Sequence, residues 1–337
     1  MIFATLEPFW LQTVKLTNSS LLPPPKRTKW LIALAAIAHD LVQDFLPQTS
    51  SNLSRKRESG VSELASIDKV TCYIQILNQQ LIRCQPDSQA LFSDRDLKII
   101  KAAIEATICS YDCLTHSVYQ PYLYGDREQI LLPARILALA DIGGLGMEGI
   151  DSFLREGSLL FLEENPDTIP LIRHYYQQPD DLPVESAAYQ SLRQRLLKRS
   201  RFQLSFARGR LASFPREVDG LPQEAITALK TEIFSHLNQK TLTQLQAITP
   251  QAGGNPPVHL ARVFRLPPAP GLRPGKNSTR LALGQLGRSS REAMAIFVTV
   301  PSQKAARIVL LGFRIGTSII HCIHLSSSVT TPLYGTR

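Results

Sequence analysis

A break in composition near residue 250 divides this 337-residue chain into two parts that must fold differently. Before the break, apolar residues recur at helical spacing and strand-like alternation is almost absent. The first 250 residues carry 26 Lys and Arg against 27 Asp and Glu, a net charge of −1. From Gln251 onward, 11 Lys and Arg face a single acid, Glu292, which gives +10. We therefore expect an all-α body followed by a basic tail of different character.

The linear pattern predicts four segments. Residues 1–29 end in LLPPPKRTK, which is typical of a linker after an N-terminal segment. A helical domain is expected over 30–175 and a helical extension over 176–249. Residues 250–337 form the basic tail, rich in Pro and Gly, which either contains short strands or stays disordered.

Helices are expected where apolar spacing is helical and the ends carry start or stop signals. The motif Ser93-x-x-Asp96, for example, is a capping-box start. The expected helices cover residues 30–46, 61–82, 96–108, 130–146, 149–165, 185–214 and 221–245. In the tail, residues 293–300 and 307–325 are rich in β-branched side chains and predict two or three strands.

Composition excludes several classes of protein. No apolar run reaches the roughly 20 residues needed to span a bilayer, so no membrane association is expected. The apolar N-terminus contains Glu7 and lacks a basic start, which argues against a signal peptide. Five cysteines in a chain of this length do not form a disulfide framework. We expect a cytoplasmic protein.

An adjacent pair, His39–Asp40, lies at the polar edge of the apolar stretch AAIAHDLVQD. An imidazole and a carboxylate together suit a borderline divalent metal ion. A second carboxylate, Asp141, follows the apolar run ILALA and precedes a glycine-rich stretch. A buried carboxylate needs a partner, because an unpaired charge in a core is very costly. A cation held by His39, Asp40 and Asp141 would satisfy all three side chains.

The HD dipeptide, a lone Asp about a hundred residues later in an ALAD context, and a helical body together resemble the HD superfamily of metal-dependent phosphohydrolases. The stretches RILALADIGGLGMEG, FLREGSLLFLEENPD and RFQLSFARGR are also similar to a bacterial branch of HD-like proteins. The resemblance covers roughly residues 30–246. It implies an HD-domain-like helical bundle with a helical C-terminal extension.

In that family, an upstream His, the HD pair and a final Asp ligate a metal ion, and a metal-bound water attacks a phosphoester. By this match, His39, Asp40 and Asp141 are the expected ligands of a divalent ion such as Mn²⁺ or Mg²⁺. The upstream His of the family has no counterpart here, because no His precedes His39. The resemblance therefore implies a site with three of its four ligands.

A metal ion would lower the pKa of its bound water and supply the nucleophile. Asp40 is expected to contact both metal and water, and Asp44 or Glu63 to orient the nucleophile as catalytic acids. Arg55 and Arg57, in the RKRE cluster, are expected to bind the phosphate of the substrate. The first hypothesis is thus a metal-dependent phosphohydrolase, or its degenerate descendant, acting on a nucleotide or small phosphoester.

The second hypothesis is a catalytically inactive HD-fold module that binds a nucleotide, nucleic acid or protein partner. The basic tail would then supply weak electrostatic attraction to nucleic acid. Under this hypothesis, His39 is an ordinary helix histidine, Asp141 caps a turn, and Arg55 and Arg57 belong to a solvated charge run. A further basic row is compatible with phosphate contacts but more typical of the solvated face of an amphipathic helix: Arg193, Arg195, Lys198, Arg199, Arg201, Arg208 and Arg210.

Overall fold

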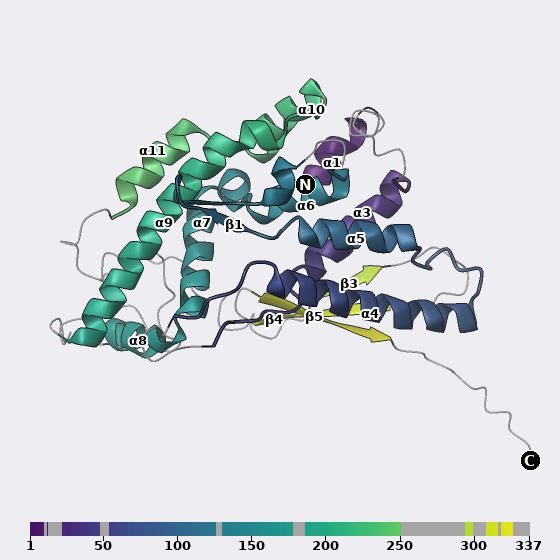
Figure 1. Ribbon diagram of the computed structural model, residues 1–337, viewed down its shortest axis with the longest axis horizontal. Helices are drawn as coiled ribbons and strands as arrows, with labels where there is room; N and C mark the ends of the chain where they lie inside the picture. The colour runs from purple at the N-terminus through teal and green to yellow at the C-terminus, as the bar shows by residue number, and fades with distance from the viewer. Residues whose placement is uncertain are drawn as a thin grey trace, which may run out of the picture. The chain divides into compact units, whose positions relative to one another are not determined.

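The computed structural model of the chain describes residues 1–9, 12, 22–47, 54–125, 130–177 and 186–250, together with the backbone of three strands between 294 and 325. The chain divides into two compact units, Met1–Ala269 and Pro270–Arg337. Within the described residues, the first unit consists of helices and one two-stranded hairpin (Figure 1). The all-α class predicted for the body is therefore confirmed at that coarse level.

The α-helices of the first unit are α1 (Ile2–Leu6), α3 (Pro25–Ala38), α4 (Val61–Cys84), α5 (Asp94–Glu105), α6 (Leu132–Asp141), α7 (Gly144–Glu164), α8 (Ile169–Gln177), α9 (Ala187–Glu217), α10 (Gln223–Ala228) and α11 (Gln239–Ile248). Four short helical turns lie between them: η1 (Glu7–Phe9), η2 (Pro121–Tyr124), η3 (Pro166–Thr168) and the π-helical turn η4 (Leu229–Ile233). The hairpin consists of β1 (Ser110–Asp112) and β2 (Ser117–Tyr119).

One hydrophobic cluster joins α3, α4 and α5, which lie side by side in Figure 1. Helix α5 begins at a capping box in which Ser93 and Asp96 satisfy each other's backbone amides, as the sequence predicts. Its apolar face then repeats at helical spacing and packs against the other two helices and Leu137 of α6. The buried side chains are Leu31, Ala35, Ala38, Ile67, Val70, Ile74, Ile99, Ile100, Ala103 and Ile104.

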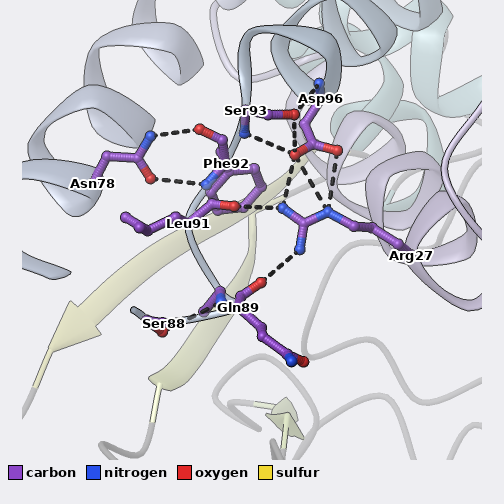
Figure 2. Close-up of polar contacts among 9 residues, drawn as sticks. Arg27, Asn78, Ser88, Gln89, Leu91, Phe92, Ser93 and Asp96 are labelled. Atoms are coloured by element: carbon purple, nitrogen blue, oxygen red, sulfur yellow. Dashed lines mark hydrogen bonds and ion pairs between the residues drawn. The ribbon is translucent and has the colours of Figure 1, made fainter. Parts of the chain in front are cut away.

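A buried ion pair fixes α3 against α5. The guanidinium of Arg27 donates to both carboxylate oxygens of Asp96, at 2.7 to 3.3 Å, and Asp96 is only 2 % exposed. The same guanidinium donates to the backbone carbonyls of Gln89 and Leu91, as Figure 2 shows. Ser93 donates to Asp96 as well. One arginine thus connects α3 to the segment that leads into α5.

A second contact holds the same segment to α4. The side-chain amide of Asn78 donates to the carbonyl of Phe92 and accepts from its amide, at 2.7 and 2.9 Å (Figure 2). Because both backbone groups of Phe92 are satisfied by one side chain, the residues before α5 lie in a fixed position between α3 and α4.

Helix α6 connects this cluster to a second one. It is buried on all sides: its first eight residues, from Leu132 to Leu139, are buried, and among them Arg135 donates to the carbonyl of Asp219. On one side it packs against α3 and α5, and on the other against α1 and the segment from the end of α9 through η4. A helix buried all round places whatever follows it at a fixed point, and Asp141 is its last residue.

Helices α7, α9 and α11 pack together beside these clusters (Figure 1). Two glycines explain how α7 begins. A Cβ on Gly146 would lie 2.9 Å from the ring of Phe234, so only glycine allows this approach. Gly149 has φ +80° and ψ −173°, which kinks the helix next to the ring of His236. The glycine-rich stretch after Asp141 therefore serves close packing.

The observed elements differ from the sequence expectation in several places. Helix α3 begins at Pro25, inside the predicted linker, and ends at Ala38 rather than at Pro47. The segment predicted as one helix over 221–245 consists of α10, η4 and α11, because the chain turns at His236, whose amide donates to the carbonyl of Gly146. The β1–β2 hairpin was not predicted at all.

In the second unit, β3 (Met294–Val298), β4 (Ile308–Ile315) and β5 (Ser318–Leu325) form an antiparallel sheet in the order β3-β4-β5. Phe297 pairs with Val309, and Leu310 pairs with Ile323. These strands lie where β-branched residues predict them. Across the part of the chain that the structure describes, no helix is long and apolar enough to cross a membrane.

Candidate functional site

His39 is the C-cap residue that directly follows α3, and its imidazole is held in a defined orientation. Nδ1 lies 2.9 Å from the carbonyl oxygen of Ala36 in the preceding turn. A ring nitrogen next to a carbonyl must carry a proton, so Nδ1 donates and Nε2 points away from the helix. The helix end therefore presents Nε2 to its surroundings.

Two carboxylates meet this nitrogen. Nε2 of His39 lies 3.3 Å from Oδ1 of Asp141 and 3.5 Å from Oδ2 of Asp40. Asp40 follows His39 directly, whereas Asp141 comes from the end of α6, which packs against α3. The structure thus brings together the three side chains that the sequence singles out, across a separation of about a hundred residues.

The electrostatics of the site favour a cationic imidazole. Burial alone would lower the pKa of His39, but its hydrogen bond to Asp141, the charges of Asp141 and Asp40, and the Ala36 carbonyl raise the pKa to about 9. Two helix C-termini, those of α3 and α6, also end here and stabilise positive charge. At neutral pH, His39 is therefore an imidazolium shared by two carboxylates.

Glu63, in the first turn of α4, also lies within the field of this cluster. Burial raises its pKa, and the negative charges of Asp40 and Asp141 raise it further. The Asp44 carboxylate, by contrast, is exposed, and within the described residues no hydrogen bond or ion pair connects it to the cluster. Its backbone amide donates to Ser62 instead. Of the two acids expected to orient a nucleophile, the structure places Glu63 at the site and leaves Asp44 outside it.

Arg57 supplies a second cation at the edge of the cluster. Its Nη1 lies 4.0 Å from Oδ1 of Asp40, and its Nη2 lies 3.1 Å from Oε1 of Glu163 at the end of α7. The guanidinium lies over the ring of Phe45, 5.2 Å from its centroid. The guanidinium of Arg55 also lies over Phe45, at 5.3 Å. Arg57, expected to bind a phosphate, is thus paired with carboxylates.

Two further residues of the site have no signal in the sequence. The buried amide of Gln120 donates to Oδ2 of Asp141 at 3.0 Å, which leaves Oδ1 facing His39. The Cys109 thiol lies nearby, and burial, together with the charges of Asp141 and Glu63, raises its pKa. The two residues flank the unpredicted β1–β2 hairpin, so no local pattern could have placed them near Asp141.

The basic row on α9 is divided between different environments. Arg195 pairs with Asp167, and Arg199 with Glu164, close to the C-terminal end of α7. Arg210 is 2 % exposed and pairs with Glu217, so it does not belong to a solvated face. The prediction of a uniformly solvated row is therefore wrong at Arg210, which the periodicity of a 31-residue helix buries with its acid partner.

The structure allows a test of the divalent ion that the resemblance implies. Bonds of 2.0–2.1 Å to a tetrahedral ion set neighbouring donor atoms about 3.3 Å apart. The distances from His39 Nε2 to the two carboxylates are of that size. Over the described ranges, however, no group of three or more His, Cys, Asp and Glu side chains is arranged so that it could hold a metal ion. The donor set forms pairs through the imidazole, and does not fit a resident metal.

Comparisons of the chain with protein-family models, with curated proteins and with solved structures found no match. The site is therefore interpreted from its own geometry.

Proposed function

We propose that this chain is a catalytically inactive, HD-like binding module. In it, the cationic imidazole of His39 supplies to Asp40 and Asp141 the positive charge that the resemblance assigns to a metal ion. The observation that supports it most is the position of His39 Nε2 between Asp141 and Asp40. The HD pair directly follows α3, and the distant Asp is the last residue of α6, which packs against α3. The described donors do not form a three-ligand group.

The charge distribution supports nucleic acid as the class of partner. The first 250 residues carry a net charge of −1, whereas the residues from 251 onward carry +10. Binding to a phosphate backbone is dominated by such clustered Lys and Arg and does not need a base-specific site. The residues from 251 onward would therefore supply the affinity for the polyanion, and they would bring the helical body to it.

The absence of hydrolysis is tested with the purified chain and excess Mn²⁺ or Mg²⁺ against a panel of nucleotides and simple phosphoesters. We expect release of phosphate at the rate of the buffer blank, for the chain and for an Asp141→Asn variant alike. Turnover by the wild-type chain that is lost in Asp141→Asn would overturn the proposal and restore the hydrolase hypothesis. The variant serves as the control for a contaminating phosphatase, whose activity the substitution would leave unchanged.

A further inference from the structure

Arg57 lies on a segment that is fixed on both sides. The Arg55 amide donates to the carbonyl of Glu164 at 2.6 Å, and the Lys56 carbonyl accepts from the amide of Leu46 at 2.8 Å. Past Arg57, the Ser59 hydroxyl donates to the carbonyl of Cys109 at 2.6 Å. The segment around Arg57 is thus bonded to three different parts of the fold, through two backbone groups and one hydroxyl, which limits the positions that its guanidinium can take.

Two contacts also hold the guanidinium of Arg57. It lies over the ring of Phe45 and forms an ion pair with Glu163 at 3.1 Å, with its side chain 33 % exposed. From that position it faces Asp40 at 4.0 Å. Its positive charge also lowers the pKa of Glu63, whereas the negative charges of Asp40 and Asp141 raise that pKa. Every carboxylate of the site except Asp141 therefore has this cation as a neighbour.

We propose that Arg57 is a built-in cation which excludes divalent metal ions from the carboxylates of Asp40 and Glu163, at the ends of α3 and α7. This inference rests on the proposed metal-free function and adds a second cation, beside His39, that opposes metal binding. A unit positive charge about 4 Å from a ligand oxygen repels an incoming divalent ion directly. It also pairs directly with a Glu163 oxygen at 3.1 Å and lies 4.0 Å from Oδ1 of Asp40.

The test uses Mn²⁺ alone as the probe and measures its affinity for the full chain by calorimetry. Arg57→Gln removes the charge, and we expect Mn²⁺ to bind it at least about tenfold more tightly than the wild-type chain. Arg55→Gln is the matched control, because Arg55 shares the Phe45 ring but has no ion pair with Asp40 among the described contacts. This control should bind Mn²⁺ as the wild-type chain does. Adding Asp40→Asn to Arg57→Gln should abolish the gain.

The ratio between Arg57→Gln and wild type decides this inference, and the wild-type affinity decides the proposed function separately. Equal affinities would overturn the role of Arg57 while leaving a weakly binding wild type as a metal-free module. Micromolar, stoichiometric Mn²⁺ binding by the wild type that Asp40→Asn removes would overturn the metal-free function itself. Should Arg57→Gln fail to fold by circular dichroism, Arg57→Met keeps an apolar stem over Phe45 and gives the same comparison.

Discussion

Arg210 and Glu217 form the most deeply buried ion pair in the described part of the chain. Their side chains are 2 % and 0 % exposed, and the Tyr124 hydroxyl donates to the same Glu217 oxygen at 2.9 Å. Removing one partner leaves the other charge without compensation inside the fold. We expect Arg210→Met to lower the free energy of unfolding by about 3–5 kcal/mol, measured by urea denaturation.

The matched control for this prediction is Arg208→Met, two residues earlier on α9. Arg208 is exposed and bonds only Gln246 among the described contacts, so its loss should change stability by less than about 1 kcal/mol. Replacing both members of the buried pair, as Arg210→Met with Glu217→Leu, should recover much of the loss. Equal effects of Arg210→Met and Arg208→Met would show that the buried pair does not carry the stability assigned to it.

For single residues, the sequence predicts which side chains belong to the site better than it predicts their contacts. His39, Asp40 and Asp141 could be singled out because an HD pair and a lone acid after an apolar run together resemble a known pattern of metal ligands. Gln120 and the pairing of Arg57 with Glu163 could not, because each contact joins segments that no periodicity relates. The same limit explains why Asp44 was expected at the site, although its carboxylate faces solvent.

Between elements, the contact of Arg27 on α3 with Asp96 on α5 makes stability depend on pH. Burial alone would raise the pKa of Asp96, but hydrogen bonds from Arg27 and Ser93, with the charge of Arg27, hold it below its usual range. A carboxyl with a lowered pKa stabilises the fold above its unfolded pKa of about 3.9, and that stability is lost as the pH falls through the folded value. We therefore expect the contribution of Asp96 to decline below about pH 4.

The comparison that isolates this contribution is Arg27→Met against Lys29→Met on the same helix. Arg27→Met should cost about 1–3 kcal/mol at pH 7 and should flatten the dependence of unfolding free energy on pH between about 5 and 2. Lys29 is exposed, and its substitution should leave the pH dependence of the unfolding free energy below about pH 5 unchanged. If that dependence were the same in both variants, the pair of Arg27 with Asp96 would not be its cause.

The kink inside α7 gives a second prediction between elements. Gly149 has φ +80° and ψ −173°, a conformation that L-residues adopt only under strain. Gly149→Ala should therefore lower the free energy of unfolding by about 1–3 kcal/mol, measured by thermal denaturation. Gly125→Ala is the control, because Gly125 has a negative φ and its Cβ would meet only ordinary contact at 3.6 Å. If Gly149→Ala left the free energy of unfolding unchanged, the positive φ assigned to Gly149 would be contradicted.

Helix existence was easier to predict than helix ends. The capping box at Ser93 and the apolar run of α6 are local signals, and both elements are present. Helix α3 ends well before the expected stop because the amides of Val42 and Asp44 bond serines on α4. That competition comes from a neighbouring element, so the sequence of α3 alone contains no sign of it.

For the whole molecule, the division of charge predicts how the chain binds polyanions. Replacing Arg273, Lys276 and Arg280 by Gln should weaken binding to a labelled single-stranded oligonucleotide. It should also reduce the slope of log affinity against log salt by about 0.7 for each phosphate that the variant no longer neutralises. The control replaces three exposed cations of the first unit, Lys69, Arg83 and Lys98, also by Gln. Equally weakened binding in the two triple variants would contradict the assignment of polyanion binding to the basic residues from 251 onward.

The protonation of His39 tests most directly whether an imidazolium replaces the metal ion. Imidazole ¹⁵N chemical shifts of the full chain, measured in the presence of a chelator, report each ring nitrogen separately. We expect both nitrogens of His39 to carry protons at about pH 7.5 and to titrate only near pH 9. Stability gained from this cation should be complete below about pH 6.5 and lost as the pH rises through about 9. A neutral ring at about pH 7.5, with a titration at or below about 6.5, would contradict the cationic site.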